Sequence, residues 1–599
     1  MDARPPEPEP PPPATGWRSE RARWWLALAS YVVLAVLFVG PRNLTNAMQV
    51  AGQGIDLPGT VWIHWWVRTT LEQGTLPVTT DLLFYPDGKN FFADTGANYL
   101  DAYLGVPFQW IFGVPGFMDP LALVILVGNS LAFAALARDL TAGRWGPAWA
   151  ATVAFSLNPF LLRQLGEGRP TQAMLWFVIL AVRYALRLRT GTPRDAALFG
   201  VFTALSALTY WFNAYFIAFG LLPFALWELA RAPRVVAPRI ALAVGFALLL
   251  TAPFLVGIAH EIDAGAVRRL QYTNWGDGPA AAGSRWRDVM TDFGAATWIA
   301  AFFLGLAAWR RSCILLLGGL FALLTAIGAQ LDVTDPMIRN YLVILLWDHL
   351  PLFSRLGFPD RATCMTFLML SLGAAYGLSR LDAVWVPLFA LGVLGEAFWS
   401  TSLPLPNTVY VPSPCASYVR AHPGPVIALP LGSSESAMIT QTAHGQPMFG
   451  GMGEREPDLR PNGYDERIRN TFLINIGATL SDSHPPIGYT LSDREAITSV
   501  FKWAWYDLKF TPPSWSAAGF NGEAVVRQLT KELGEPVMRV GRCAVFDLQA
   551  PVPTNAPGLD PSAKRATDEL IRLGISNVDA AAAMGERKHP GLPPPRETP

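Results

Sequence analysis

The chain has 599 residues, of which 51% are hydrophobic and only 15% are charged. Soluble domains carry about 25% charged residues, and the mean hydropathy here is +0.27. These values exclude a purely soluble protein and favour a multi-span membrane protein with a soluble part. The 46 basic and 46 acidic residues cancel to a net charge of zero, which leaves no case for nucleic-acid binding.

Residues 1–23 precede the first apolar run. Their proline-rich stretch PPEPEPPPP favours a disordered cytoplasmic tail, with an SH3-type ligand as the alternative. Three arginines then stand before the apolar run 24–40, and no small-residue cleavage site follows. The run is therefore predicted to be a retained signal-anchor.

Eleven apolar runs approach the length needed to cross the ~30 Å hydrocarbon core of a membrane. They are 24–40, 120–137, 147–162, 172–188, 196–213, 214–230, 240–258, 295–309, 312–330, 362–379 and 383–400. The stretch 196–230 would be ~52 Å long as one helix, so a turn near Tyr210–Asn213 is expected to divide it. Segment 99–112 is predicted to be an interfacial or re-entrant helix, because a span there would invert every later loop.

Arginines mark one side of the membrane. With the N-terminus in the cytoplasm, each predicted inside loop contains arginine, as the positive-inside rule requires. These residues are Arg138, Arg144, Arg187, Arg189, Arg194, Arg231, Arg234, Arg239, Arg310, Arg311 and Arg380. The pattern places the loops 41–118, 259–294 and 331–361 outside. The sequence thus predicts a helical transmembrane domain over 24–400 in a bacterial cytoplasmic membrane.

Residues 401–550 lack long apolar runs and are predicted to form an extracytoplasmic α/β domain. Local patterns predict a strand at 424–432, a helix end or strand before a glycine turn at 439–451, a helix at 521–534 and two strands in 535–548. The tail 551–599 is rich in proline and charge, so we expect it to be mostly disordered, with a short helix at 561–573.

Two of the four cysteines, Cys415 and Cys543, fall in the predicted external domain. Because that compartment is oxidising in many bacteria, we predict that they form a disulfide, with free thiols as the alternative. Cys313 and Cys364 lie in predicted spans and suit apolar packing. No His/Cys spacing indicates a zinc site.

The long first outer loop holds the first candidate site. A helix over 57–73 would place Asp56, Thr60 and His64 on one face. Its other face would carry Trp62, Trp65 and Trp66, which suits the membrane interface and would turn the Asp56 face towards a cavity. Asp56 before Leu57–Pro58 is also a good helix N-cap. Capping and catalysis are compatible, and both interpretations stay open.

The same loop contains FYPDGKNFF. Pro86–Asp87–Gly88 is a turn signal, and this is the favoured interpretation. The functional alternative is a loop over the active cavity that brings Tyr85 and Lys89 near the substrate.

Two further outer segments carry candidate anion-binding residues. LGEGRP contains Glu167 and Arg169, and LPLFSRLGFPDRAT contains Arg355 and Arg361. Guanidinium groups at a membrane surface suit phosphate recognition. The alternatives are snorkelling towards lipid headgroups or a local Arg–Asp pair.

Taken together, these segments resemble bacterial integral-membrane glycosyltransferases of the GT-C superfamily, in a branch with a C-terminal external domain. The resemblance rests on the Asp56 loop with its Trp-rich helix and FYPDG, on SLNPFLLRQLGEGRP, on LPLFSRLGFPDRAT, and on VIALPLG followed by ITQTAHGQPMFGG. It covers most of the chain from 24 to 550.

The resemblance implies a sugar carried on polyprenyl phosphate and hexosyl or pentosyl transfer at the outer membrane face, in cell-envelope glycan synthesis. The acceptor would be a glycan, a lipid or a protein. Asp56 matches the acidic residue that such enzymes place in the first outer loop. Better-known members often have a second acid beside it, where this chain has Leu57, so a divalent metal cofactor is left open.

On this hypothesis Asp56 is the general base for an acceptor hydroxyl, and Arg355 or Arg361 stabilises the departing lipid phosphate. Two other functions are compatible with a membrane protein of this kind, a transporter and a scaffold. A lipid-linked glycan transporter would show inverted repeats and a polar central path, which this sequence lacks. A non-catalytic scaffold of an envelope-polysaccharide machine stays open.

Overall fold

The computed structural model describes residues 20–46, 49–54, 56–94, 96–263, 296–308, 311–328, 330–331, 338–350, 353, 356, 359–400, 404–410, 413–431, 434–454, 460–478, 487–507, 522–541 and 543–562. Most of both predicted disordered tails, and most of the expected helix at 561–573, lie outside these ranges. The chain divides into two compact units. A helical unit comprises Met1–Ala47, Met118–Thr251 and Leu270–Asn407, and a sheet unit comprises Met48–Phe117, Ala252–Arg269 and Thr408–Pro599.

The helical unit is built mainly from apolar helices. Its helices are α1 (Glu20–Val39), α2 (Pro41–Thr45), α6 (Met118–Leu140), α7 (Trp145–Ser156), α8 (Pro159–Gly166), α9 (Pro170–Ala173), α10 (Trp176–Ala185), α11 (Pro193–Thr209), α12 (Phe212–Arg231), α15 (Ala296–Ala307), α16 (Arg311–Ala326), α17 (Tyr341–His349), the 3-10 helix η4 (Pro359–Ala362), α18 (Thr363–Leu378) and α19 (Trp385–Ser400). α13 (Pro233–Asp263) begins in this unit, and β4 (Gln330–Leu331) pairs with β5 (Ile338–Arg339).

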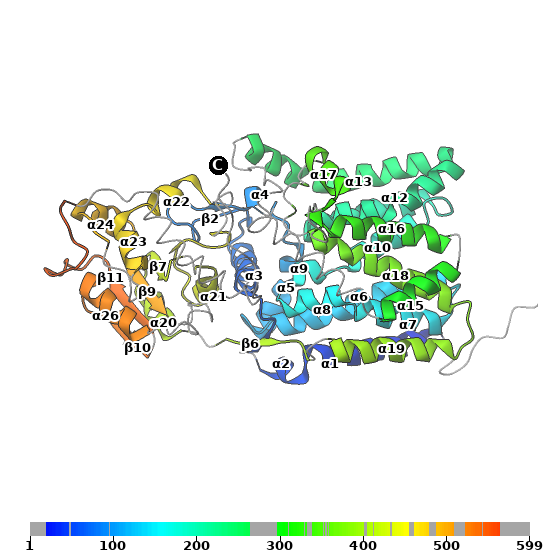
Figure 1. Ribbon diagram of the computed structural model, residues 1–599, viewed down its shortest axis with the longest axis horizontal. Coiled ribbons are helices and arrows are strands. Elements are labelled where there is room, and N and C mark those ends of the chain that lie inside the picture. The colour runs from blue at the N-terminus through cyan, green and yellow to red at the C-terminus, as the bar shows by residue number, and fades with distance from the viewer. Residues whose placement is uncertain are drawn as a thin grey trace, which may run out of the picture. The chain divides into compact units, whose positions relative to one another are not determined.

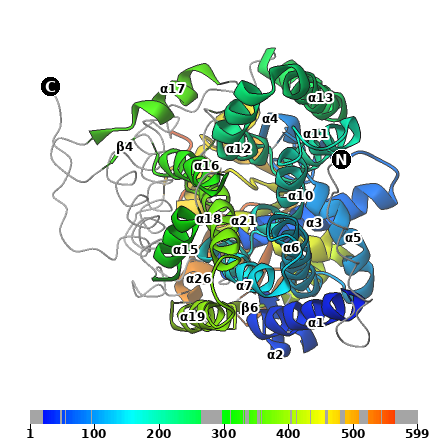
Figure 2. The same cartoon turned by 90° about the vertical axis from the view of Figure 1, so that its right-hand side faces the viewer.

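Small residues let the helices of this unit approach one another closely. α6, α7, α10, α12, α16 and α18 run side by side (Figure 1) and are seen nearly end on in Figure 2. A Cβ added to Gly318 of α16 would lie only 1.9 Å from the carbonyl oxygen of Gly220 in α12. Such backbone contact is typical of helices packed within a membrane. The hydrophobic effect does not drive helices together there, and small residues allow close van der Waals contact instead.

Every one of the eleven predicted spans overlaps a helix. The expected turn is confirmed, since α11 ends at Thr209 and α12 begins at Phe212. The run 147–162 is not a single helix, because Asn158 caps a new helix by accepting a hydrogen bond from Leu161 N–H, and Pro159 follows it. Four helices, α1, α6, α12 and α13, are long and apolar enough to cross a membrane, and α15, α16 and α19 are shorter apolar helices. The number of crossings stays a prediction.

The sheet unit combines the first loop with the C-terminal residues. Its helices are α3 (Leu57–Glu72), α4 (Phe91–Asp94), α5 (Leu100–Phe112), α20 (Pro414–Ala421), α21 (Ser434–His444), α22 (Asn462–Arg467), α23 (Thr471–Ala478), α24 (Leu491–Thr498) and α26 (Gly522–Leu533). Its strands are β1 (Gln49–Ala51), β2 (Thr79–Thr80), β3 (Lys89–Asn90), β6 (Asn407–Val409), β7 (Val426–Leu429), β8 (Met448–Phe449), β9 (Trp503–Asp507), β10 (Met538–Val540) and β11 (Cys543–Asp547).

Five of these strands form a mixed sheet in the order β10-β11-β9-β7-β8. β7 runs parallel to both β8 and β9, whereas β11 runs antiparallel to β9 and β10. The predicted strand in 424–432, the glycine turn after the helix end at His444, the 521–534 helix and the two strands in 535–548 are all confirmed. Gly534, with φ of 92°, follows the last residue of α26 and ends the helix.

The edge of β8 is covered by a segment of the first loop. Met448 N–H donates to the carbonyl of Leu82 (2.9 Å), and Tyr85 N–H donates to the carbonyl of Met448 (3.1 Å). Phe84 N–H likewise reaches the carbonyl of Gly450 (2.9 Å). Residues 82–85 thus satisfy backbone groups that an open sheet edge would leave unpaired.

A buried glutamine ties three parts of this unit together. Gln441, fully buried, accepts a hydrogen bond from Trp62 Nε1 at 2.7 Å. Its amide nitrogen donates to the carbonyls of Leu82 (2.7 Å) and Gln446 (2.8 Å). Both donors and the acceptor of the amide are therefore used, as a buried polar group requires.

The expectation that the tryptophan face of α3 lies at the membrane interface is wrong. Trp62, Trp65 and Trp66 are all buried, with exposed fractions of 0, 8 and 2%. Trp66 packs on Phe91 with ring centroids 4.7 Å apart, and α3 packs against α21. The tryptophans belong to the core of the sheet unit because distant segments of the chain cover them.

We expect Gln441→Leu to loosen the sheet unit. The substitution removes the acceptor of the Trp62 indole and the donor to the Gln446 carbonyl, and each buried unsatisfied group costs about 1–3 kcal/mol. Limited proteolysis of the purified full chain should therefore cut within 48–117 and 408–562 at least about tenfold faster. Gln549→Leu, at an exposed position of the same unit, is the matched control. Equal cleavage rates for both variants would contradict the role given to Gln441.

His444, at the end of α21, is a structural histidine. Its Nδ1 accepts the backbone N–H of Gln446 at 3.0 Å, and its ring packs on the edge of Trp505. Burial lowers the pKa of His444 to about 3, from an ordinary value of 6.5. The folded chain thus keeps this ring neutral at a pH where the unfolded chain protonates it.

The stability contributed by neutral His444 is complete above pH 6.5 and declines as the pH falls towards 3. At pH 5 the loss amounts to roughly 2 kcal/mol. His444→Asn keeps an acceptor for the Gln446 N–H but does not titrate. Between pH 7 and pH 5, the unfolding temperature of the variant should therefore fall less than that of the wild type. If the unfolding temperatures of the two proteins fall equally between pH 7 and pH 5, His444 is not the source of the pH dependence.

Candidate functional site

Asp56 stands at the start of α3, in the sheet unit. The helix begins at Leu57 with Pro58 in its first turn, and Asp56 is the N-cap residue by position. Its side chain makes no cap hydrogen bond, and its backbone lies in the helical region, with φ of −79° and ψ of −15°. An N-cap side chain usually acts from an extended backbone. The capping interpretation therefore does not explain the half-buried carboxylate.

His64 does not open into a cavity, contrary to the expectation for the Asp56 face of α3. It is 1% exposed, and its Nδ1 lies 2.8 Å from the Thr60 carbonyl. Its Nε2 lies 3.7 Å from an Asp101 carboxylate oxygen, and its ring packs on Phe117. Gln109 Nε2 donates to the His64 carbonyl at 2.8 Å. The contacts with Asp101 and Gln109 hold α3 against α5.

The turn interpretation of FYPDG is confirmed. Asp87 N–H and Gly88 N–H both donate to the Phe84 carbonyl, at 2.9 and 3.1 Å, and Gly88 has φ of 74°. The Asp87 carboxylate accepts two hydrogen bonds from Arg467 of α22, at 2.8 and 3.2 Å. This forked pair holds the turn against the C-terminal part of the sheet unit.

Lys89 and Tyr85 flank this turn. Lys89 is 5% exposed, and its Nζ donates to the Met452 carbonyl at 2.5 Å and lies over the Phe84 ring. Tyr85 is half-buried, with its ring edge against Phe501. Lys89 thus supports the loop from inside, and of the two residues only Tyr85 presents surface.

The helical unit gathers a second set of candidates, here called the outer arginine cluster: Arg163, Tyr210, Asp360 and Arg361. Arg361 Nη1 donates to the Tyr210 hydroxyl at 2.7 Å, and its guanidinium lies 5.3 Å from the centre of that ring. Arg163 Nη2 donates to Asp360 at 3.2 Å. The four residues come from three connections that the arginine pattern places on the outer side.

Sequence reasoning missed Arg163 and Tyr210 as members of this cluster. Arg163 lies within the segment SLNPFLLRQLGEGRP, and Tyr210 lies at the turn that divides the 196–230 stretch. The sequence does place both residues near the outer ends of predicted spans. It does not show their partners, which lie 197 and 151 residues away in the chain.

The remaining predicted residues are placed as follows. Glu167 and Arg169 form an ion pair with each other just after α8. Arg355 lies outside the described residues. In the sheet unit Cys415 and Cys543 are joined by a disulfide, with Cα atoms 6.3 Å apart, a separation that a disulfide accommodates.

A metal site does not emerge from the described ranges. Within them, no three His, Cys, Asp or Glu side chains gather in a way that could hold a metal ion. Leu57 beside Asp56 adds no ligand.

No protein-family model matches the chain, and no curated protein matches it in sequence. The solved structure of arabinofuranosyltransferase AftD from mycobacteria matches with a TM-score of 0.56 and 16% identity, covering 88% of this chain and 40% of that one. A variant of the same enzyme gives 0.55 and 15%, covering 88% and 42%. ArnT from Cupriavidus metallidurans gives 0.46 and 14%, covering 89% and 100%, a score too low to establish a common fold.

The chain thus spans about two fifths of the length of AftD. At this identity the match concerns the fold alone. It extends over most of the described helices and strands, in both units. This chain has the fold of the GT-C superfamily of membrane glycosyltransferases.

Proposed function

We propose that this chain is a membrane glycosyltransferase that moves a sugar from a polyprenyl-phosphate carrier to an acceptor at the outer face of a bacterial cytoplasmic membrane. The observation that carries the proposal is the fold shared with AftD over 88% of this chain. The apolar helices of the helical unit suit a protein that meets its donor within the membrane. The sugar is a hexose or a pentose, and the acceptor is a glycan, a lipid or a protein of the cell envelope.

Asp56 is proposed as the general base. Glycosyl transfer forms a bond between an acceptor hydroxyl oxygen and the anomeric carbon while the bond from that carbon to the lipid phosphate breaks. The hydroxyl becomes a better nucleophile when a carboxylate accepts its proton. Asp56 is half-buried at the start of α3, in the loop where the family resemblance expects the acidic residue, which supports this role.

The outer arginine cluster is proposed to receive the departing lipid phosphate. Negative charge grows on that phosphate as the bond breaks, and a fixed guanidinium stabilises it. Tyr210 holds Arg361 by a hydrogen bond and by its ring, so little motion is needed when the charge develops. Arg355, six residues after the end of α17 on the same connection and outside the described ranges, is proposed as a second phosphate contact.

The other candidates receive smaller roles. Tyr85 and Arg169 are proposed substrate contacts, and Glu167 orients Arg169 through their ion pair. His64 and Lys89, which are buried, are proposed to support the Asp56 loop without touching the substrate.

Asp56→Asn should lower transfer about 10²–10⁴-fold, the usual contribution of a general base. The measurement is transfer from radiolabelled polyprenyl-phosphate sugars in membranes that contain the full chain. The control is Asp81→Asn, an exposed carboxylate of the same loop, which should transfer at the wild-type rate. Undiminished transfer by a normally folded Asp56→Asn variant would remove Asp56 as the base.

Arg361→Gln should lower turnover roughly 10²-fold, because it removes the fixed positive charge that faces the leaving group. Tyr210→Phe should lower it less, since the guanidinium stays but loses its anchoring hydroxyl. Arg380→Gln, an exposed arginine after α18, is the matched control. If Arg361→Gln raises only the KM for the lipid donor and leaves kcat unchanged, the residue binds the donor without stabilising the departing phosphate.

A further inference from the structure

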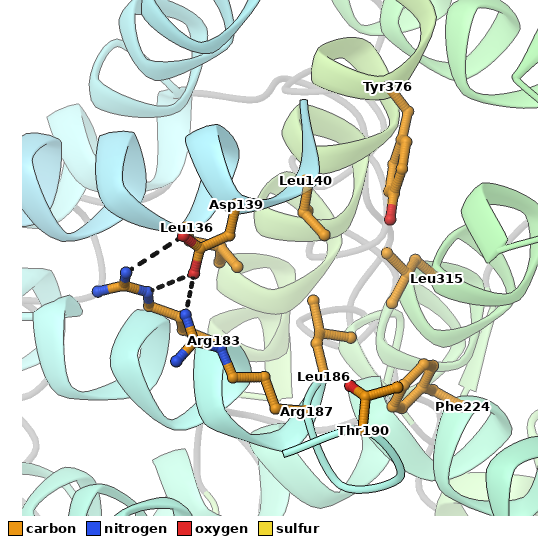
Figure 3. A pocket seen from close by; sticks show the side chains of 10 residues that line it. All are labelled: Leu136, Asp139, Leu140, Arg183, Leu186, Arg187, Thr190, Phe224, Leu315 and Tyr376. Atoms are coloured by element: carbon orange, nitrogen blue, oxygen red, sulfur yellow. Dashed lines mark hydrogen bonds and ion pairs between the residues drawn. The ribbon is translucent and has the colours of Figure 1, made fainter. Parts of the chain in front are cut away.

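A pocket lies at the opposite end of the helical unit from the outer arginine cluster, among connections that the arginine pattern assigns to the cytoplasm. It is lined by the ends of α6 and α10, by the turn after α10, and by α12, α16 and α18 (Figure 3). The lining residues are Leu136, Asp139, Leu140, Arg183, Leu186, Arg187, Thr190, Phe224, Leu315 and Tyr376.

One wall of this pocket is charged. Arg183 donates to both oxygens of Asp139, at 2.7 and 3.3 Å, and Arg187 donates to the same carboxylate at 2.5 Å. Each guanidinium has five N–H donors, and Asp139 takes two from Arg183 and one from Arg187. Asp195 adds a longer contact of 3.5 Å to Arg187 while its carboxylate caps α11 through Thr192.

The local charge is positive. The segment 183–195 carries four arginines, and the carboxylates bonded to them are Asp139, Asp195 and Glu228. Among the residues that line the pocket, Arg183 and Arg187 carry two positive charges and Asp139 carries one negative charge, and Asp139 holds both guanidiniums in fixed positions. Such an arrangement suits the two-pronged recognition of a phosphate oxyanion.

The other wall is apolar, made by four leucines and Phe224. Two of the helices that line it, α12 and α16, also expose leucines on their outer surfaces: Leu226 is 56% exposed and Leu317 is 53% exposed. In a membrane these surfaces face lipid. An inorganic anion would use the charged wall only, whereas an amphiphile with a phosphate head and a hydrocarbon chain fits both walls.

We propose that this pocket binds the phosphate headgroup of an anionic glycerophospholipid of the cytoplasmic leaflet. The unshared N–H groups of Arg183 and Arg187 hold the phosphate, and the first part of an acyl chain lies along Leu186 and Phe224. The site is distinct from the proposed donor site, since its residues come from other connections of the same unit.

The test is native mass spectrometry of the purified full chain in neutral detergent, titrated with phosphatidylglycerol, phosphatidylcholine or inorganic phosphate. We expect one phosphatidylglycerol to bind more tightly than phosphatidylcholine. Arg183→Gln combined with Arg187→Gln should weaken it about tenfold or more, because charge-assisted hydrogen bonds are lost. Arg194→Gln, an exposed arginine of the same segment outside the pocket lining, should bind as the wild type does.

Because the double variant strips Asp139 of its partners, Thr190→Trp provides a second test. Thr190 is exposed on the turn after α10 and lines the pocket, so an indole there would obstruct the pocket and leave the ion pairs intact. It should weaken phosphatidylglycerol binding to a similar extent. Wild-type binding by both altered proteins would overturn the proposal. Inorganic phosphate that displaces the lipid completely at millimolar concentration would also overturn it, since the apolar wall would then contribute nothing.

Discussion

The buried amide of Gln441 is the interaction on which the sheet unit depends. It bridges α3, the covered edge of β8 and the turn after α21 through three hydrogen bonds, and Trp62 reaches it across 379 residues of chain. A buried amide is stable only when all its partners are present. The segment that carries Asp56 is therefore a structural part of the sheet unit, and the contacts of α3 fix the position of Asp56 at its N-cap.

The helical unit depends on a different constraint. Its helices pack through glycine contacts such as that between Gly220 and Gly318, while its charged side chains gather at the helix ends. At one end Arg361 is held by Tyr210, and at the other Arg183 and Arg187 share Asp139. Charges are costly inside a membrane, so a helical bundle of this kind collects them at its two surfaces. Both proposed phosphate sites follow from that separation.

Local patterns predicted most of the helices and strands. Apolar runs located the helices, Pro86–Asp87–Gly88 predicted a turn, and Gly534 predicted the end of α26, because each depends on residues adjacent in sequence. The break at Asn158–Pro159 was missed, although an N-cap residue followed by proline is a local signal. The outer arginine cluster was predicted in part: Arg361 was identified, whereas Arg163 and Tyr210 were not, since only the folded chain brings their connections together.

The sequence by itself determined the apolar runs, the loops in which arginines collect, and Asp56 as the acidic residue to test. Only the tertiary structure decided which surfaces are covered. Some side chains are amphipathic or polar and therefore suit a membrane interface, an open cavity or a core equally well. These are the tryptophans of α3, His64 and Lys89. Their burial depends on partners far away in the chain, and the periodicity of a single helix carries no information about those partners.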